Sequence, residues 1–574
     1  MPPPFPTALS QALVPLAYTF VAIGINILAY VVYELSLRLL RLYRSPLREL
    51  AGPPSLSWVF GSVEGIIEAD AERLFDQWAQ QYGRTFKYSS FFNSNKLFTA
   101  DLKAVQFVLN SPNFEKSDQL KFALGELLGN GNYLSSAVED SVLTSFAQAY
   151  CLLKVQSISD KEKLCTQNPA FGFSELRKFT GTFVEKALEL RDIWSTQIHK
   201  HARPDGKLQV DAFDWMNKVT LDMIGLAGFN HDFSSLHPSE SETHELHDAV
   251  RKMFDIEAQT LTFLVQALFP PTRIFPTKRS RTTAHSLKAI RRIGTRMITE
   301  KKAEVLAARS VVESKDIAGR DLLSLLIKSN MAMDLQENER MTDEEILSQV
   351  PAFLVAGHET TSSGITWALF ALAAHPQIQA KLRSELSAVR TDRPSMDELN
   401  SLTYLDATIR ETMRLHSPVP ITERVATTDT VIPLDSPYVD KKGVKHTTVR
   451  LGARDTVLIP MRSINRSKDL WGYDAEEFIP ERWLETNNAV RAIPSVWSNI
   501  TSFLAGPHAC IGYRFAVLEM KALMFALVRA FEFEAAIQAE DVGRRCNIVG
   551  RPYLCSNPGA GPQLPLLIRE VQER

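Results

Sequence analysis

The chain has 574 residues, of which 45% are hydrophobic and 23% charged, and its formal net charge is −2. This balance is typical of a globular protein and excludes the strong basic excess that binding of nucleic acid by charge requires. The five cysteines form neither a disulfide framework nor a CxxC metal motif, which favours a reducing compartment.

The first predicted element is an apolar helix at residues 13–35, LVPLAYTFVAIGINILAYVVYEL. About 20 apolar residues cross the hydrocarbon core of a bilayer, so we expect a transmembrane anchor after a short lumenal tail at residues 1–12. No Lys or Arg precedes Arg38, which argues against a cleaved signal peptide. The arginines from Arg38 onward place the rest of the chain in the cytosol. A helix buried in the protein core is the alternative interpretation.

A basic neck and a proline-rich hinge follow at residues 36–62, and they leave residues 63–574 as one large body. The paired prolines of AGPPSLSWVFGS predict a stiff, non-helical connector. The clearest helix of the body is predicted over residues 342–375. Thr342 and Glu345 have the spacing of a capping box, and His375 followed by a proline ends the pattern. Because this span is apolar on most faces, we expect the helix to be central.

Shorter elements are predicted after this helix. Ser395 and Glu398 form a second predicted capping box, ahead of the helical segment LTYLDATIRETMRLHSP. Runs of β-branched residues broken by turn residues predict short strands and hairpins between residues 424 and 460. After Cys510, the run YRFAVLEMKALMFALVRAFEF predicts another buried helix. The predicted fold class is therefore mainly α with a small β region.

A polar stretch interrupts the predicted central helix at AGHETT, residues 356–361. Ala356 and Gly357 are small enough for a flat group to approach the backbone. Glu359 and Thr360 place an acid beside a hydroxyl, and burying such a pair costs free energy unless it is satisfied, so proton delivery is one interpretation. A polar patch for helix packing is the other. His358 has the chemistry of a metal ligand, but packing is the favoured interpretation for it.

Two motifs further along the chain predict an ion-pair network. In ETMR, Glu411 and Arg414 are three residues apart on one helix face and can pair. In FIPERW, Arg482 can complete a buried Glu–Arg–Arg network. Such pairs are also frequent on solvated helices, so the motif alone is not specific.

The stretch FLAGPHACIG, residues 503–512, holds Cys510 between glycines at the predicted start of a helix. The N–H groups and the dipole of a helix N-terminus stabilise a thiolate, which is the form of cysteine that binds a soft or redox-active metal. Gly506 and Gly512 allow backbone conformations that other residues resist. A buried and inert cysteine is the alternative.

In order and spacing, these motifs resemble the cytochrome P-450 superfamily of haem-thiolate monooxygenases, over nearly the whole chain. AGHETT is similar to the oxygen-activation motif of that family, ETMR to its ExxR pair, FIPERW to its PERF-type segment and FLAGPHACIG to its haem-binding loop. The anchor, the neck and the GPPS hinge resemble the microsomal, fungal-type branch. The resemblance implies the cytochrome P-450 fold, with residues 63–574 as the haem-binding catalytic domain.

The resemblance implies haem b, iron protoporphyrin IX, as cofactor, with Cys510 as the axial ligand of the iron. It also implies that Glu359 and Thr360 relay protons to dioxygen. The other residues implied at the cofactor are Phe503 and Gly512 of the loop, Ala356 and Gly357 beside the dioxygen, and Arg424 and His508 at the haem propionates. The implied structural network behind the loop consists of Glu411, Arg414 and Arg482.

A lipophilic small molecule is the implied substrate, and an apolar pocket would hold it largely by burial. Its predicted lining is Phe353, Leu354, Val419, Pro420 and Ile421, with ordinary core packing as the alternative for each. Dioxygen is the expected co-substrate, and a membrane-bound NADPH-cytochrome P-450 reductase is the expected electron donor. We expect a single-pass protein of the endoplasmic reticulum membrane. Residues 261–279 combine apolar residues, prolines and basic residues, which predicts an access loop that dips into membrane lipid.

The chain departs from the family pattern in two places. His508 stands where the family usually has an arginine, so the charge at that position depends on pH. The third main helix of the family normally brings a Trp or His and a basic residue to the propionates, but residues 121–176 contain no Trp, His or Arg. Residues 141–167 are therefore interpreted as an atypical insertion, such as a retained intron or a gene-model error. If the insertion is genuine, it predicts weakened haem retention.

Three other interpretations stay open. A haem-thiolate isomerase or dehydratase would need neither dioxygen nor a reductase, and the intact Glu359–Thr360 pair argues against it. A degenerate, haem-poor membrane protein is favoured only by the stretch at residues 141–167. A secreted glycoprotein is the remaining topology, because Asn465 and Asn499 begin glycosylation sequons.

Overall fold

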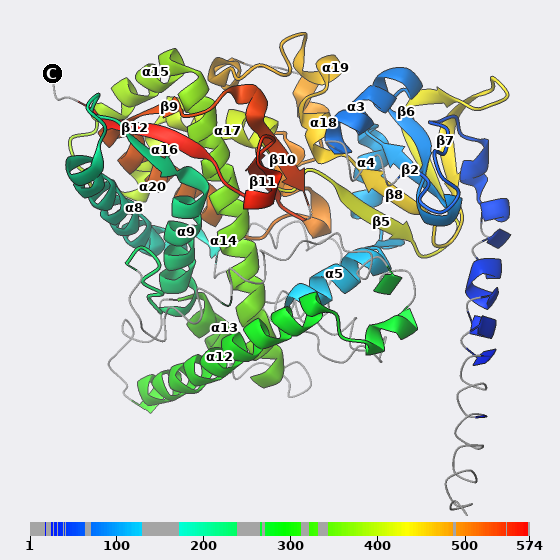
Figure 1. The fold of residues 1–574 in the computed structure, drawn as a ribbon, viewed down its shortest axis with the longest axis horizontal. Helices are drawn as coiled ribbons and strands as arrows, with labels where there is room; N and C mark the ends of the chain where they lie inside the picture. The colour runs from blue at the N-terminus through cyan, green and yellow to red at the C-terminus, as the bar shows by residue number, and fades with distance from the viewer. Residues whose placement is uncertain are drawn as a thin grey trace, which may run out of the picture. The chain divides into compact units, whose positions relative to one another are not determined.

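The computed structural model describes residues 18, 25–26, 28–30, 32–37, 39–40, 42–62, 71–128, 171–237, 249, 265–266, 270–310, 321–330, 343–485, 489–546 and 548–571. The chain forms two compact units (Figure 1). The first unit consists of Met1–Ala104, Asn113–Glu115 and Arg424–Leu458, and the second of Val105–Pro112, Lys116–Glu423 and Ile459–Arg574. The described elements are mostly helices with small sheets, in agreement with the predicted fold class.

The first unit is built around a mixed sheet whose described strands have the order β1-β2-β8-β5-β3. Strands β1 and β2 are antiparallel, β2 and β8 are parallel, and β3 and β5 are antiparallel. Strands β6 and β7 form a separate antiparallel hairpin. The bounds are η1 Pro46–Glu49, α3 Ala71–Tyr82, β1 Thr85–Ser89, η2 Phe91–Asn93, β2 Asn95–Thr99, β3 Phe114–Glu115, β5 Thr422–Ala426, β6 Thr430–Val439, β7 Lys445–Leu451 and β8 Thr456–Ile459. Helix α4, Leu102–Asn110, begins in the first unit and continues in the second.

Aromatic side chains form the core of the first unit. Phe86 of β1 stacks on its cross-strand partner Phe98 of β2, with ring centroids 4.4 Å apart. Phe75 of α3 stacks on Phe98 at 5.5 Å, and all three rings are buried. Burial of these large apolar surfaces holds α3 against the sheet.

The second unit contains the long helices. Its elements up to the central helix are α5 Asp118–Leu128, α8 Phe173–His201, β4 Leu208–Asp211, α9 Ala212–Phe229, η5 Pro270–Ile274, α12 Lys278–Ser310, α13 Leu322–Asn330 and α14 Asp343–Ala374. They are followed by α15 Pro376–Ser387, α16 Met396–Ser401, α17 Thr403–Leu415, α18 Met461–Asn465, α19 Lys468–Trp471, η7 Pro480–Trp483, η8 Ala489–Ala492, η9 Thr501–Phe503, η10 Gly506–His508 and α20 Tyr513–Ala530. The C-terminal elements are β9 Phe531–Ala535, η11 Ala539–Asp541, β10 Val542–Cys546, β11 Gly550–Leu554, η12 Pro558–Ala560 and β12 Pro565–Glu570.

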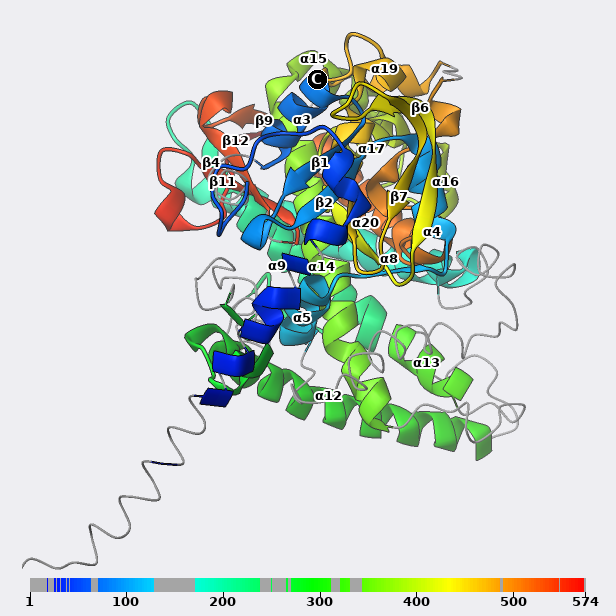
Figure 2. The same cartoon turned by 90° about the vertical axis from the view of Figure 1, so that its right-hand side faces the viewer.

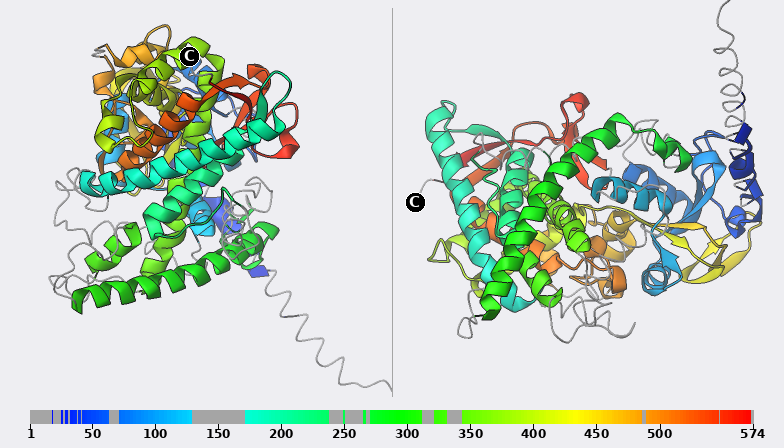
Figure 3. Two further views of the ribbon diagram at one scale, coloured as in Figure 1. Left: turned by 90° about the vertical axis from the view of Figure 1, so that its left-hand side faces the viewer. Right: turned by 90° about the horizontal axis from the view of Figure 1, so that it is seen from below.

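Helix α14 is the central element of the second unit, as its apolar sequence predicted. Figures 1 and 2 show it running from α12 at one end toward α15 and α17 at the other. Three glycines mark close contacts along it: Gly294 of α12 lies against Leu347, and Gly357 and Gly364 of α14 itself lie against α9 and α20. A helix with neighbours on this many sides must be apolar on most faces. Figure 3 shows the long helices α8 and α12 in further views.

The predicted helix ends agree with the structure to within a residue or two. Helix α14 ends at Ala374, and His375 is the N-cap of α15, which begins at Pro376. The second capping box is confirmed: the backbone N–H of Glu398 donates to Ser395 Oγ at 3.2 Å, and the N–H of Ser395 donates to Glu398 Oε2 at 2.7 Å. Thr342, the first residue of the other predicted box, lies outside the described residues.

Leu402 adopts an extended conformation and separates α16, which the capping box begins, from α17, which lies within the predicted helical segment. The strands predicted between residues 424 and 460 are confirmed as β5 to β8, and the helix predicted after Cys510 is confirmed as α20. No helix occurs in the described connector at residues 51–62, as its paired prolines predicted.

The structure describes only part of the predicted N-terminal anchor. Most of residues 13–35 lie outside the described residues, and within the described part of the chain no helix is both long and apolar enough to cross a membrane. Tyr18, Ile25, Leu28, Val32 and Tyr33 are described, and 55–72% of each of these residues is exposed. This exposure contradicts the alternative interpretation of a helix buried in the protein core. Residues 141–167 also lie outside the described residues.

Candidate active site

Cys510 follows a loop built from two short 3-10 helices, η9 and η10. Gly506, the first residue of η10, has a φ of +61°, and a Cβ there would collide with Asn110 Oδ1, so this position favours glycine. The backbone N–H of Cys510 donates to Phe503 O at 2.8 Å and closes the loop. Gly512 was expected to adopt a backbone conformation that other residues resist. This expectation was wrong, because its φ is −88°, a value that any residue adopts.

The side chain of Cys510 is exposed, and the residue lies two positions before Gly512, the N-cap of α20. His508 is exposed as well, whereas Ala509 and Tyr513 are 9% and 7% exposed. Phe503 is buried, and its ring lies 5.4 Å from the ring of Trp497. The loop therefore turns Cys510 and His508 outward while its other side packs on the protein.

Asn465 at the end of α18 holds this loop from behind. Its Oδ1 accepts the backbone N–H of Thr501 at 2.8 Å, and its Nδ2 donates to Ser502 Oγ at 2.9 Å. Ser502 Oγ in turn donates to the carbonyl of Met413 on α17 at 2.6 Å. Because Asn465 is 0% exposed and engaged in these bonds, its sequon cannot accept a glycan in the folded protein, which removes one of the two sequons behind the glycoprotein interpretation.

The structure brings Glu411, Arg414 and Arg482 together in one buried network. Arg414 Nε and Nη2 donate to the two carboxylate oxygens of Glu411, each at 2.8 Å, and Arg482 Nε donates to Oε1 at 2.9 Å. Trp483 Nε1 donates to Oε2 at 2.9 Å. The side chains of Glu411 and Arg414 are 0% exposed, and burial lowers the pKa of Arg414 although Glu411 opposes that shift. The bidentate geometry is the arrangement that makes a buried ion pair tolerable.

Asn465 connects the buried network to the cysteine loop. Arg414 Nη1 donates to the backbone carbonyl of Asn465 at 2.9 Å, and the Asn465 side chain bonds the loop. A rigid path therefore leads from the Glu411 carboxylate through Arg414 and Asn465 to the turn that precedes Cys510. The role of this network is to hold the loop, because none of its members is exposed enough to react.

The AGHETT stretch lies in the middle of α14, and its residues have different surroundings on different faces. Ala356 is exposed and Phe353 and Thr360 are half-buried, although most residues of α14 are buried. Thr360 Oγ1 donates to the carbonyl of Ala356 at 2.7 Å. These three residues, at i, i+3 and i+7, lie along one face of the helix, so α14 has a single open side at this level.

Gly357 allows close packing between helices. A Cβ at this position would meet Ile224 Cδ1 at 2.8 Å, so the missing side chain lets α9 approach α14. His358 is 4% exposed, and its carbonyl accepts a hydrogen bond from Thr220 of α9 at 3.3 Å. Packing is thus the correct interpretation for His358, and the described residues contain no cluster of His, Cys, Asp or Glu that could hold a metal ion.

Glu359 is buried and forms an ion pair that the motifs did not indicate. Arg551 Nε of β11 donates to Glu359 Oε1 at 2.5 Å, and the side chains are 14% and 3% exposed. The two residues are 192 positions apart, so no local pattern could have identified the pair. Glu359 and Thr360 are therefore adjacent in sequence but have different partners.

Glu519 of α20 is a second buried acid that was overlooked. It is 0% exposed, and burial raises its pKa well above the usual value, although a hydrogen bond with Thr361 opposes that shift. Burial therefore favours the neutral form of this side chain. The sequence does indicate this residue, because Glu519 lies inside the apolar run YRFAVLEMKALMF, where an acid is unexpected.

The remaining predicted residues are Arg424, Leu354, Val419, Pro420 and Ile421, and the structure describes all of them. Arg424 lies in β5 and belongs to the first unit. It is 1% exposed, and burial lowers its pKa to about 10. Val419 and Ile421 in the segment after α17 are half-buried and Pro420 is buried. Leu354 is 1% exposed and packs in the core, as its alternative interpretation held.

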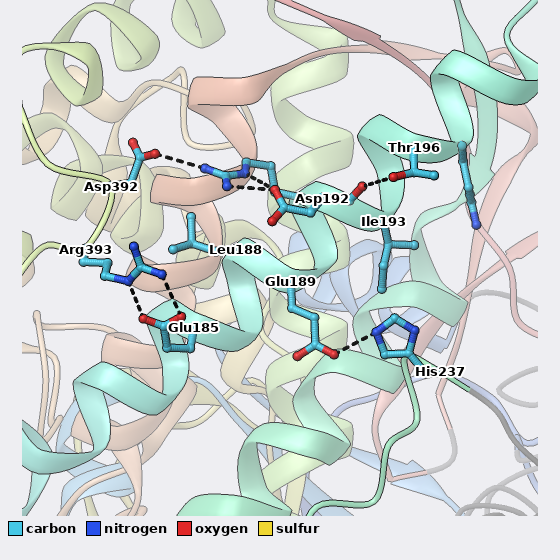
Figure 4. A pocket seen from close by; sticks show the side chains of 11 residues that line it. Glu185, Leu188, Glu189, Asp192, Ile193, Thr196, His237, Asp392 and Arg393 are labelled. Carbon is cyan, nitrogen blue, oxygen red and sulfur yellow. Dashed lines mark hydrogen bonds and ion pairs between the residues drawn. The ribbon is translucent and has the colours of Figure 1, made fainter.

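A surface cavity of about 670 Å³ lies along α8, away from every predicted site residue (Figure 4). It is lined by Glu185, Leu188, Glu189, Arg191, Asp192, Ile193, Thr196, Gln197, His237, Asp392 and Arg393. Within it, Arg393 pairs with Glu185 at 2.6 Å, and His237 lies 3.0 Å from Glu189. None of the predicted site residues lines this cavity. This cavity is therefore not the candidate active site.

The residues of the second unit fit a haem. A haem needs a sulfur ligand on a rigid stretch of backbone. It also needs a small side chain where a larger one would collide with it. Cys510 and Ala356 meet these needs, and both are exposed, so a flat group that covers them would bury them.

Comparison with known proteins agrees with this geometry. The family model for cytochrome P-450 matches residues 51–546. Cytochrome P-450 monooxygenase 205 of Postia placenta is 45% identical over 96% of this chain and 97% of its own length, and monooxygenase 128 of the same fungus is 43% identical over the same shares. Cytochrome P-450 monooxygenase claW of Ampulloclitocybe clavipes is 32% identical over 92% of this chain and 94% of its own length. The chain therefore belongs to the cytochrome P-450 family of monooxygenases.

Proposed function

We propose that this protein is a haem-thiolate monooxygenase that transfers one oxygen atom of dioxygen to a lipophilic small molecule, with electrons from NADPH supplied by a cytochrome P-450 reductase. The observation that carries the proposal is the exposed thiol of Cys510, on a loop that buried hydrogen bonds hold in place. Membership of the cytochrome P-450 family supports the same conclusion.

When bound, haem b would supply dioxygen activation and the electron chemistry, with the Cys510 thiolate as the ligand from the protein. The Glu411 network and Asn465 keep the Cys510 sulfur in position. Arg424 and His508 are cationic or hydrogen-bonding groups suited to carboxylates, and we assign them to the haem propionates.

Proton supply is assigned to two side chains of α14. The hydroxyl of Thr360 is bonded to the Ala356 carbonyl on the open side of the helix, where it can orient a water or an oxygen atom. Glu359 is the nearest acid in the sequence and is the group that can take up and release a proton. We assign Phe353, Val419 and Ile421, which are half-buried, to the apolar wall that holds substrate and excludes water.

Attachment to the endoplasmic reticulum membrane is the second part of the proposal. Exposed apolar side chains along residues 18–33 support an anchor. In the predicted access loop, Ile274 and Phe275 are 64% and 69% exposed just ahead of the basic start of α12, a combination suited to a lipid interface. Deleting residues 1–35 should leave membrane association that is lost when Ile274 and Phe275 are also changed to serine. Complete solubility of the deletion variant would contradict the access loop.

The central test is the absorption spectrum of the reduced protein under carbon monoxide, compared with that of Cys510→Ser. We expect the thiolate-type band in the parent protein and its loss in the variant. Turnover should then require the reductase and dioxygen, and turnover without either would favour the isomerase or dehydratase. A parent protein that folds without haem would favour the degenerate membrane protein.

A further inference from the structure

Three cationic side chains of the first unit gather where η1, β1 and the turn between β6 and β7 meet. They belong to Arg48, Lys87 and Lys441, which we call the cationic cluster. Main-chain bonds hold their segments together. The N–H of Lys87 donates to the carbonyl of Ala51 at 3.1 Å. The N–H of Lys441 donates to the carbonyl of Glu49, also at 3.1 Å. The fold of the backbone therefore places the three like charges side by side.

The side chains of the cationic cluster also lie close to one another. Lys441 Nζ donates to the backbone carbonyl of Arg48 at 3.1 Å. Lys87 is half-buried, and its pKa is lowered to about 8 by burial and by the neighbouring charges of Lys441 and Arg48. Like charges at this range repel one another, so the arrangement is unfavourable unless an anion shares the site.

Two carboxylates near the cationic cluster are engaged with other groups. Glu49 forms an ion pair with Lys442 at 2.9 Å. Asp440 lies 3.0 Å from Nε2 of His446 and accepts the backbone N–H of Lys442 at 2.8 Å. Within the described residues, no carboxylate forms an ion pair with a member of the cationic cluster. The cluster therefore remains a centre of positive charge in the folded protein.

An amide donor lies beside the cationic cluster. Lys87 Nζ donates to Asn95 Oδ1 at 2.7 Å, between β1 and β2, and this bond fixes the orientation of the Asn95 amide. Asn95 is 9% exposed, and its Nδ2 has no hydrogen-bond partner among the described residues. Ammonium, guanidinium and amide groups are the donors that proteins use to bind a phosphate group. The chemistry of the site therefore fits a phosphate.

The position of the cationic cluster in the chain indicates where that phosphate comes from. Arg48 follows the end of the predicted anchor, residue 35, by 13 positions, which is about 20 Å of helix. A chain anchored in a membrane therefore keeps the cluster close to the cytosolic lipid headgroups. Clusters of Lys and Arg just outside an anchor attract anionic lipids, whereas a zwitterionic headgroup brings a cation of its own to the site.

We propose that Arg48, Lys87 and Lys441, together with Asn95, form a binding site for the phosphate group of an anionic phospholipid. This inference extends the proposed membrane attachment, and it uses none of the residues assigned to the haem. The bound lipid would fix the first unit to the membrane surface by a specific contact, in addition to the apolar anchor.

The test uses the full-length, haem-loaded protein in a neutral detergent. It is titrated by calorimetry with dihexanoyl phosphatidylserine, dihexanoyl phosphatidylcholine and inorganic phosphate. We expect the serine lipid to bind, inorganic phosphate to bind more weakly and the choline lipid not to bind. Lys87→Gln and Lys441→Gln should each weaken binding of the serine lipid by about fivefold or more. The matched control is Lys442→Gln, which removes the same charge at the adjacent residue, whose charge Glu49 already neutralises.

The second measurement is the pKa of Lys87, followed by NMR of protein whose lysines carry carbon-13 methyl groups, with Lys87→Gln to assign the signal. A bound phosphate favours the charged ammonium. The serine lipid should therefore raise this pKa from about 8 towards the ordinary value of 10.5, and the choline lipid should leave it unchanged.

Equal binding of the two lipids would overturn the proposal, and so would an unmoved pKa of Lys87. Equal losses in Lys441→Gln and Lys442→Gln would also overturn it, because they would indicate attraction to overall charge instead of a site. Tighter binding of inorganic phosphate than of the serine lipid would exclude a lipid ligand. If Lys87→Gln does not fold, Lys441→Gln decides, since Lys441 is exposed. Complete solubility after deletion of residues 1–35 would instead count against the proposed attachment, because these titrations contain no membrane.

Discussion

Replacing Glu411 by glutamine tests the buried network most sharply. Glutamine keeps the size of the side chain, so the change creates no cavity. It removes the negative charge that Arg414 and Arg482 share and turns an amide NH₂ toward groups that are themselves donors. The side chain of Arg414 is 0% exposed, so solvent cannot take over the role of the carboxylate.

The expected cost follows from this burial. Removing one partner of a buried, hydrogen-bonded ion pair costs about 3–5 kcal/mol. Since domains are stable by about 5–15 kcal/mol, the loss is a large fraction of the total. Because Arg414 also bonds the carbonyl of Asn465 behind the cysteine loop, haem retention should fall together with stability.

The assay is urea unfolding of the haem-loaded protein, followed by both circular dichroism and haem absorbance. The matched control is Arg393→Gln, which breaks the exposed Arg393–Glu185 pair, whose side chains are 68% and 56% exposed. The control should leave the midpoint unchanged, because exposed pairs contribute little. A loss below about 1 kcal/mol in Glu411→Gln, or one equal to that of the control, would refute the reasoning.

Three further predictions concern the loop and the buried acid. Cys510→Ser should fold normally by circular dichroism but lose the thiolate-type band, and an unchanged band would show that another residue binds the iron. Asn465→Ala should release the bonds to Thr501 and Ser502, so that haem dissociates faster while α17 and α20 stay folded; an unchanged dissociation rate would exclude Asn465 as the anchor of the loop. The raised pKa of Glu519 means that its contribution to stability is present below its usual value of 4.5 and is lost as the pH rises toward the raised value. Glu519→Gln should therefore weaken the loss of stability that urea titrations show as the pH rises above 4.5, and an identical pH profile in both proteins would contradict a raised pKa of Glu519.

Much of the local structure of this protein follows from short-range signals. The end of α14 at His375 depends on a proline at the next position, and the capping box of Ser395 and Glu398 depends on residues three apart. These are steric and hydrogen-bonding preferences of neighbouring residues, so the sequence contains them directly.

The motifs also identified the residues that carry chemistry, but not always their surroundings. Cys510, Thr360 and the Glu411 network became candidates through the order and spacing of all the motifs together, by which they resemble the family. Gly357 was predicted beside a cofactor, and in the structure its missing side chain also lets Ile224 of α9 pack closely. A small residue on a helix has the same appearance in a sequence whether a ligand or another helix approaches it.

The sequence by itself determined which elements form and which side chains are candidates for the reaction, because both depend on residues close together in the chain. Only the tertiary structure decided the partners. It joined Glu359 to Arg551 across 192 residues, connected Arg414 to the cysteine loop through Asn465, and removed Glu519 from solvent. These properties depend on burial and on contacts between distant segments, and both arise only when the chain folds.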